Sequence, residues 1–363
     1  MKLFRCHCEA TPVLHFENRR CGACDRLAGF DPATMTVCAW EPDGDGWRAV
    51  AAGGSRRRLC ANRTQHDACN WMVDERDGSA WCSACRRNVV IPDLSVAANL
   101  APWRRLEAAK RRCLFTLMAL HLPLDAGDGL PALTFRFLSD RDSRSNFEQP
   151  LPGSEPVLTG HDHGVVTINL AEADSVARVR MQLDMAERYR TPLGHFRHEC
   201  GHYAWDRLAA RDGGFADRGR ALFGDERSDY EAALRRHYAQ GAPPDWERHY
   251  ISAYASAHPF EDWAETWAHY LHIVDTLETQ QSFARALHER DIDAVPLPQE
   301  VGFGTRAQER DMERILTRWV QVSLMLNGLN RSMGLPDPYP FVIQQAVRDK
   351  LAFIHAELLG LDG

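Results

Sequence analysis

The sequence predicts an α+β fold in which a small cysteine-rich module precedes a larger, mostly helical domain. Three observations lead to this prediction. Nine of the eleven cysteines lie in the first quarter of the chain. The first 92 residues consist of short runs separated by turn-forming residues. From about residue 99, apolar residues recur at the three- and four-residue spacing of amphipathic helices.

The composition excludes several classes of protein. The chain of 363 residues is 44% hydrophobic and 26% charged, which is typical of a globular protein with about two domains. No apolar run is long enough to span a membrane. The N-terminus lacks the apolar segment of a secretory signal, so we expect a cytoplasmic location. The net charge is −7, and residues 1–92 hold 13 Lys/Arg against 11 Asp/Glu. Neither residues 1–92 nor the rest of the chain is basic enough to indicate a dedicated nucleic-acid binder.

Residues 1–92 are predicted to form a module that metal ions stabilise. Alternation at 35–40 favours a strand, and turns follow at 42–46 and 53–55. So short a segment buries little apolar surface, and the odd number of cysteines argues against a disulfide framework. Two sets of four cysteines are each expected to bind one structural zinc ion: Cys6, Cys8, Cys21 and Cys24, and Cys60, Cys69, Cys82 and Cys85. Cys38 and His66 are alternative ligands, although Cys38 is first interpreted as a core thiol.

After a predicted linker at 93–98, residues 99–363 are predicted to form the second domain. A long helix carries Trp103, Leu106, Ala109, Cys113, Leu117 and Leu120 on one face. Further helices are predicted at 175–189, 192–210, 226–238, 260–275, 309–327 and 341–359, with strands at 133–138 and 165–170. Cys113 and Cys200 lie on apolar helix faces and are expected in the core. We interpret strand 165–170 as the sheet edge, and assign His161 and His163 before it to turn chemistry only.

His198, Glu199 and His202 form an HExxH motif in the helix predicted at 192–210. Residues four apart share one helix face, so both imidazoles can bind one zinc ion, and Glu199 then lies beside the open coordination position. A helix with two surface histidines is the alternative, but a chance match to this motif is rare. His195 lies one turn earlier, and we expect it to be structural or substrate-facing rather than a ligand.

A third zinc ligand must come from another segment, and the helix at 260–275 is the best source. Its residues Glu261, Glu265, His269 and His272 fall on one side, opposite Trp263, Trp267 and Tyr270. A solvated acidic face would show the same pattern. The HExxH motif upstream favours the functional interpretation, and either carboxylate could reach the metal.

The HExxH motif followed by Glu261-Asp-Trp-Ala-Glu265 resembles the gluzincin clan of metallopeptidases. This resemblance implies that Glu261 is the third zinc ligand and that Glu265 supports a ligand histidine. Gluzincins of the lethal-factor type also place a tyrosine seven residues before the ligand glutamate, where Tyr254 stands here. The resemblance implies that Tyr254 polarises the scissile carbonyl, and a buried structural tyrosine is the alternative.

Nearly the whole chain resembles a bacterial family of zinc-binding metallopeptidases with an N-terminal zinc ribbon. The resemblance covers the cysteines at 60, 69, 82 and 85, the segment 91–95, the helix around 103–112, the HExxH motif, 261–269 and 339–341. It implies a zincin-like fold and a zinc site but no particular substrate. From the HExxH motif we expect hydrolysis of a protein or peptide by zinc-activated water, with Glu199 as general base.

Two alternatives to a peptidase that acts without a partner remain open. In the first, the protein is non-catalytic: the zinc ribbon binds a protein partner and the zincin fold is a scaffold. In the second, the ribbon binds nucleic acid through the arginines at 56–58, 86 and 87 and brings the zincin domain to a target bound to DNA or RNA. The small net charge of the module disfavours the second.

Overall fold

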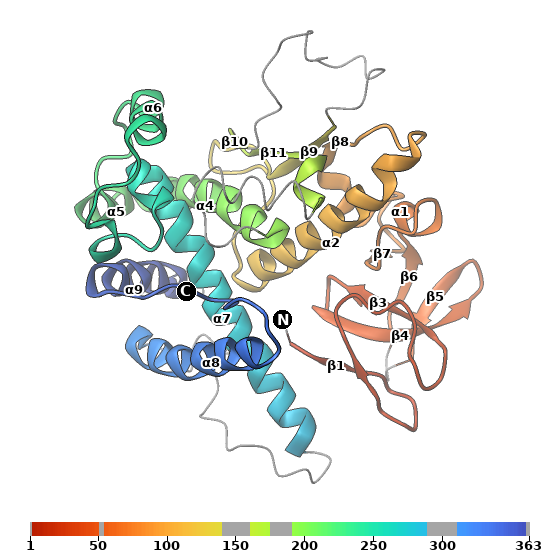
Figure 1. Cartoon of the computed structure of the whole chain (residues 1–363). Coiled ribbons are helices and arrows are strands. Elements are labelled where there is room, and N and C mark those ends of the chain that lie inside the picture. The colour runs from red at the N-terminus through yellow and green to blue at the C-terminus, as the bar shows by residue number, and fades with distance from the viewer. Residues whose placement is uncertain (1, 51–53, 140–159, 175–190, 289–310, 361–363) are drawn as a thin grey trace.

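The computed structural model describes residues 2–50, 54–139, 160–174, 191–288 and 311–360 (Figure 1). A cysteine-rich module of short strands precedes a mostly helical region that contains a small sheet, which confirms the predicted α+β class. The helix predicted at 175–189 lies outside the described residues. No described helix is long and apolar enough to cross a membrane.

The N-terminal module contains two small antiparallel sheets. The two-stranded sheet pairs β1 (Phe4–Arg5) with β2 (Val13–Leu14). The five-stranded sheet runs in sequence order through β3 (Leu27–Asp31), β4 (Thr36–Asp43), β5 (Gly46–Ala49), β6 (Arg56–Leu59) and β7 (Met72–Asp74). The short helix α1 (Ala61–Thr64) follows β6. The strand predicted at 35–40 is therefore confirmed as part of β4.

The helical region surrounds a four-stranded sheet with the order β10-β11-β9-β8. Its strands are β8 (Asn88–Val90), β9 (Thr134–Leu138), β10 (Gly160–Asp162) and β11 (Val165–Asn169). Our interpretation of strand 165–170 as the edge is wrong, because β10 pairs with the outer side of β11. His163 and Gly164 both have positive φ angles, 44° and 81°, which is the conformation of a tight hairpin turn.

Helices make up most of the remaining chain. They are α2 (Ala97–Ala119), α4 (Pro192–Arg211), α5 (Phe215–Phe223), α6 (Tyr230–Gln240), α7 (Pro259–His288), α8 (Met312–Ser332) and α9 (Gln345–Leu359). Helix α7 continues well past the predicted end at 275, because residues 276–288 contain no proline or glycine. Helix α5 was not predicted, since it is short and follows the glycine pair at 213–214.

One hydrophobic core joins the module to the helical region. The ring of Phe30 in β3 lies 4.6 Å from that of Trp71 and 5.7 Å from that of Phe115 in α2. The Phe30–Phe115 contact shows that the module covers one side of α2. Strand β8, which precedes the predicted linker, pairs with β9 of the helical region. Cys113 and Cys200 are fully buried, as predicted.

Candidate metal centre

The candidate site lies where α4 and α7 pack side by side (Figure 1). Helix α4 begins at Pro192, and the Thr191 hydroxyl accepts a hydrogen bond from the Gly194 amide at 3.0 Å. The helices approach closely at Gly201, where a Cβ atom would lie 3.0 Å from Trp267 Cδ1. The Trp263 indole also donates a hydrogen bond to the Gly201 carbonyl at 2.8 Å. The glycine inside the HExxH motif therefore lets α7 present its carboxylates to the motif histidines.

Three buried side chains from these helices converge. Glu261 Oε2 lies 3.0 Å from His198 Nε2, and Glu261 Oε1 lies 3.5 Å from His202 Nε2. The donor atoms of the three residues lie within 4.8 Å of one another. Burial alone would raise the pKa of Glu261, but the two histidines and a hydrogen bond from Tyr230 lower it to about 2. Glu261 is therefore a carboxylate at neutral pH.

The donor set fits a zinc ion. Among the described residues, Glu261 Oε2 is buried without a hydrogen-bond partner although His198 Nε2 is close by, so the contact lacks hydrogen-bond geometry. This arrangement is expected when the lone pairs of an imidazole and a carboxylate point to a common cation. A buried carboxylate oxygen without a partner is costly, and a divalent cation would remove that cost. Two imidazoles and one carboxylate are ligands that zinc accepts.

Glu265 lies on the other side of the His198 ring. Its Oε1 is 2.7 Å from His198 Nδ1, and its Oε2 accepts a hydrogen bond from the Ser252 hydroxyl at 2.7 Å. A carboxylate in this position holds the imidazole so that Nε2 faces the centre. Helix geometry alone left either glutamate as the ligand, and the resemblance to gluzincins implied Glu261. The structure places Glu261 among the donors and Glu265 behind His198.

Glu199 lies beside the three donors and is buried. Its Oε1 is 3.1 Å from His195 Nε2, and His195 Nδ1 is 3.3 Å from Glu172 Oε2. Burial opposes ionisation of Glu199, but the neighbouring histidines lower its pKa, so it is a carboxylate that can accept a proton. Burial also opposes the charge of His195, and the two carboxylates outweigh it and raise its pKa to about 9.

Two tyrosines lie at the centre, and the sequence singled out one of them. Tyr254 begins the 3-10 helix η4 (Tyr254–Ala257), and its ring centroid is 6.0 Å from that of His198. Burial raises the pKa of Tyr254 well above its usual value, so its hydroxyl stays protonated. Tyr230 on α6 was missed, yet its hydroxyl donates to Glu261 Oε1 at 2.6 Å. No spacing rule links Tyr230 to the motif, so the sequence held no signal for it.

The two histidines of the hairpin have different surroundings. The His161 ring on edge strand β10 is stacked 6.2 Å from the His202 ring, so His161 also borders the centre. Burial lowers the pKa of His161 to about 4. His163 is exposed and contacts Asp162 at 2.5 Å. The assignment of His161 to the turn alone therefore missed a contact that the hairpin creates.

The two cysteine sets each gather around a common point. In both sets all four Sγ atoms lie within 4.8 Å of one another: Cys6, Cys8, Cys21 and Cys24, and Cys60, Cys69, Cys82 and Cys85. The contacts Cys6–Cys24 and Cys69–Cys82 measure 3.8 and 3.7 Å. Thiolates bound to zinc at 2.3 Å in a tetrahedron are about 3.8 Å apart. Both sets therefore have the dimensions of a structural zinc site.

The two alternative ligands lie elsewhere. Cys38 packs with Trp40 and Met72 in a small separate cluster, which agrees with its interpretation as a core thiol. The His66 ring lies 5.8 Å from that of Trp103. Neither residue belongs to a donor group among the described residues.

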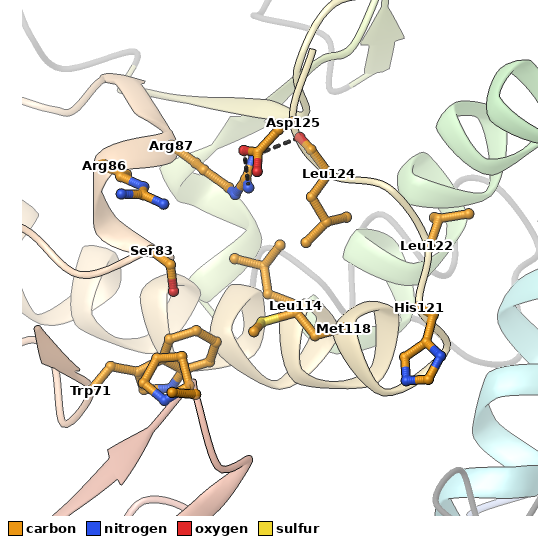
Figure 2. A pocket seen from close by; sticks show the side chains of 12 residues that line it. Trp71, Ser83, Arg86, Arg87, Leu114, Met118, His121, Leu122, Leu124 and Asp125 are labelled. Carbon is orange, nitrogen blue, oxygen red and sulfur yellow. Dashed lines mark hydrogen bonds and ion pairs between the residues drawn. The ribbon is translucent and has the colours of Figure 1, made fainter. Parts of the chain in front are cut away.

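A cavity of about 450 Å³ lies away from this centre, between the module and the C-terminal end of α2 (Figure 2). It contains none of the predicted ligands. Arg87 in its wall is buried, donates to the Leu124 carbonyl and pairs with Asp125 at 2.7 Å. Arg86 pairs with Asp77 at 3.0 Å. These two candidate nucleic-acid contacts therefore already have acidic partners within the chain.

The other arginines considered as nucleic-acid contacts are also engaged. Arg57 is buried and pairs with Asp31 at 3.1 Å. Arg56 contacts Asp45 and Glu75, and Arg58 donates to main-chain carbonyls. Arg56, Arg57 and Arg58 therefore all have partners within the module.

Comparison with known proteins agrees with this geometry. Residues 99–357 match the family described as "Putative zinc-binding metallo-peptidase", and residues 3–96 match a zinc-ribbon domain. Uncharacterized proteins of Mycobacterium tuberculosis and Mycobacterium bovis are each 40% identical over 345 residues, which cover 94% of this chain and 91% of theirs. The search of solved structures gave no match. The chain belongs to this family of zinc-binding metallopeptidases, with a zinc ribbon at its N-terminus.

Proposed function

We propose that the protein hydrolyses peptide bonds, with a zinc ion held by His198, His202 and Glu261 and with Glu199 as general base. The observation that carries this proposal is the convergence of the three donors around a carboxylate oxygen that has no hydrogen-bond partner in the described part of the chain. Glu199 lies beside them and is not one of the donors. Membership of a metallopeptidase family supports the same reaction.

The roles of the side chains follow from their positions. A bound zinc ion would act as a Lewis acid toward water and toward the scissile carbonyl. Glu199 accepts the proton of the attacking water and passes it to the leaving amine. Glu265 and Ser252 keep the His198 ring in its orientation. Tyr254, with its protonated hydroxyl, donates a hydrogen bond to the oxygen that becomes negative.

The intact HExxH motif favours an enzyme over a zincin scaffold without activity, because a scaffold has no need of a buried carboxylate at Glu199 that is not one of the metal donors. The pairing of these arginines with acidic residues of the same chain argues against nucleic acid as the partner of the module. Salt-dependent binding of the full chain to duplex or single-stranded nucleic acid would support that alternative instead.

The test uses the full chain loaded with zinc and a diverse library of peptides read by mass spectrometry. We expect cleavage by the wild type and a loss of about 10²–10⁴-fold in the Glu199→Gln variant, which lacks the base. The zinc content and circular dichroism of that variant should be unchanged, because Glu199 is not a donor. Equal cleavage by the two proteins, or none by the wild type, would overturn the proposed function.

A further inference from the structure

His195 connects the base Glu199 to a second buried carboxylate. It lies on α4, one turn before His198, with a side chain only 13% exposed. Its Nε2 is 3.1 Å from Glu199 Oε1, and its Nδ1 is 3.3 Å from Glu172 Oε2. The two ring nitrogens thus face one carboxylate each. The three side chains form a line that ends on the proposed base.

Glu172 reaches this line from a different part of the fold. It lies on the 3-10 helix η2 (Leu170–Ala173), directly after strand β11, and is 2% exposed. Asn169 fixes the start of η2, since its side chain accepts a hydrogen bond from the Ala171 amide at 3.0 Å. Helix η2 packs against α2. Glu172 is therefore anchored to the sheet and to α2, independently of α7.

A buried carboxylate faces an imidazole on both sides of the centre, but the two contacts differ. Glu265 Oε1 is hydrogen-bonded to His198 Nδ1 at 2.7 Å, on the side of the ring that faces away from the donors. Glu172 Oε2 lies 3.3 Å from His195 Nδ1, on the side that faces away from Glu199, as an ion pair without hydrogen-bond geometry in the described structure. Burying two carboxylates and an imidazole is costly, and apolar side chains of similar volume would often give a fold of at least equal stability. A role in orienting Glu199 accounts for this cost.

We propose that His195 and Glu172 are positioning residues for Glu199. His195 holds Oε1 of the base, which leaves the other carboxylate oxygen for the attacking water, and Glu172 fixes the His195 ring. This inference rests on the proposed function, because it assigns to Glu199 the role of base. It extends that function to two residues outside the HExxH motif and the α7 helix.

The activity test compares four variants of the full zinc-loaded chain. His195→Leu should lower kcat by about 10–100-fold, the usual cost of losing a group that orients an active side chain, with KM changed less than about twofold. His195→Gln should recover part of this loss, because its amide can still donate to Glu199. Glu172→Gln should give a smaller loss in kcat. Adding it to His195→Leu should cost little more, because both act through the same contact.

The control is His163→Leu, which replaces an exposed histidine at the hairpin turn and should leave kcat unchanged. Zinc content should be the same in all these proteins, because neither His195 nor Glu172 belongs to the donor group. An unchanged kcat in His195→Leu, alongside a strong loss in Glu199→Gln, would overturn the positioning role and leave the proposed function intact. Loss of zinc from His195→Leu would instead point to a structural role.

A second measurement does not depend on activity. Crystal structures of the zinc-loaded wild type and His195→Leu should show one orientation of the Glu199 carboxylate in the first and more than one in the second. The same single orientation in both would overturn the inference even if no peptide substrate were cleaved. Absence of cleavage by the wild type would count against the proposed function alone.

Discussion

His198 Nδ1 and Glu265 Oε1 lie 2.7 Å apart, so this carboxylate contacts the ring nitrogen that faces away from the donor group. Glu261 faces the opposite nitrogen, Nε2. The two glutamates lie one helical turn apart on α7, and the imidazole between them distinguishes their roles.

The first prediction therefore separates these two glutamates. Glu261→Ala removes one of three donors, and the catalytic zinc should be lost under mild chelation while the cysteine sites keep theirs. Glu265→Ala leaves the donors in place and should weaken zinc affinity or activity by about 10–100-fold. Competition with a fluorescent chelator measures both. Stronger zinc loss in Glu265→Ala than in Glu261→Ala would reverse the assignment.

The second prediction concerns zinc content. The described residues contain three groups with the dimensions of a metal site. Gently purified protein should hold three zinc ions per chain by elemental analysis. Cys82→Ser should lower this to two and destabilise the fold, because a structural zinc contributes directly to folding. A single zinc in the wild type would contradict the interpretation of the cysteine sets.

The third prediction distinguishes the two tyrosines. Tyr230 donates to Glu261, so Tyr230→Phe should weaken zinc binding by loosening this carboxylate. The Tyr254 ring lies against His198, and no hydrogen bond joins its hydroxyl to a donor in the described structure. Tyr254→Phe should lower kcat with unchanged zinc affinity. Parallel chelator titrations and peptide assays check this, and equal effects of both variants on zinc affinity would contradict it.

The sequence predicted the donor residues because their spacing follows from helix geometry. His198 and His202 share a face of any helix, and a zinc site needs a third ligand. Helix geometry alone could not choose between Glu261 and Glu265, since both lie on one face of α7, and the choice of Glu261 came from the resemblance to gluzincins. That choice depends on the position of α7 along α4. The two helices approach each other closely at Gly201.

Residues brought in by tertiary structure escaped prediction. Tyr230 and Glu172 reach the centre from α6 and η2, and neither stands at a spacing that local rules recognise. The edge strand β10 was not predicted, because its three residues are too few to show the alternation of apolar and polar side chains that indicates a strand. Its hairpin partner β11 was recognised, and the error lay in the position of β11 within the sheet.

The fourth prediction concerns acid stability. Burial lowers the pKa of His269 to about 4, and its Nδ1 lies 2.8 Å from the Tyr339 hydroxyl. The folded state thus holds His269 neutral, whereas the unfolded chain takes up a proton near pH 6.5. Its contribution to stability is complete above pH 6.5 and is lost as the pH falls toward 4, by roughly 3 kcal/mol at most.

Urea denaturation between pH 4 and 7.5 measures this effect. The free energy of unfolding of His269→Gln should depend less steeply on pH below 6.5 than that of the wild type. The control His163→Gln removes an exposed histidine and should leave the slope in place. Parallel curves for wild type and His269→Gln would show that this histidine does not cause the acid sensitivity.

The last prediction tests whether Gly201 sets the approach of α4 and α7. In most helix interiors, replacing glycine by alanine stabilises a protein by about 0.5–1 kcal/mol. At Gly201 the new Cβ would lie 3.0 Å from Trp267 Cδ1 and 3.1 Å from Ala264 Cα, and the second contact is main chain that cannot rotate away. We therefore expect Gly201→Ala to destabilise the fold by about 1–3 kcal/mol, as overpacking does. Zinc affinity should fall as well, because Glu261 would move away from His198 and His202 together with α7.

Gly328 in α8 has no described neighbour within 4 Å of a Cβ, so Gly328→Ala is the matched control and should stabilise the protein with zinc binding unchanged. Urea denaturation and chelator titration of the two variants decide the matter. A stabilised Gly201→Ala with full zinc affinity would show that the helices do not depend on this glycine for their spacing.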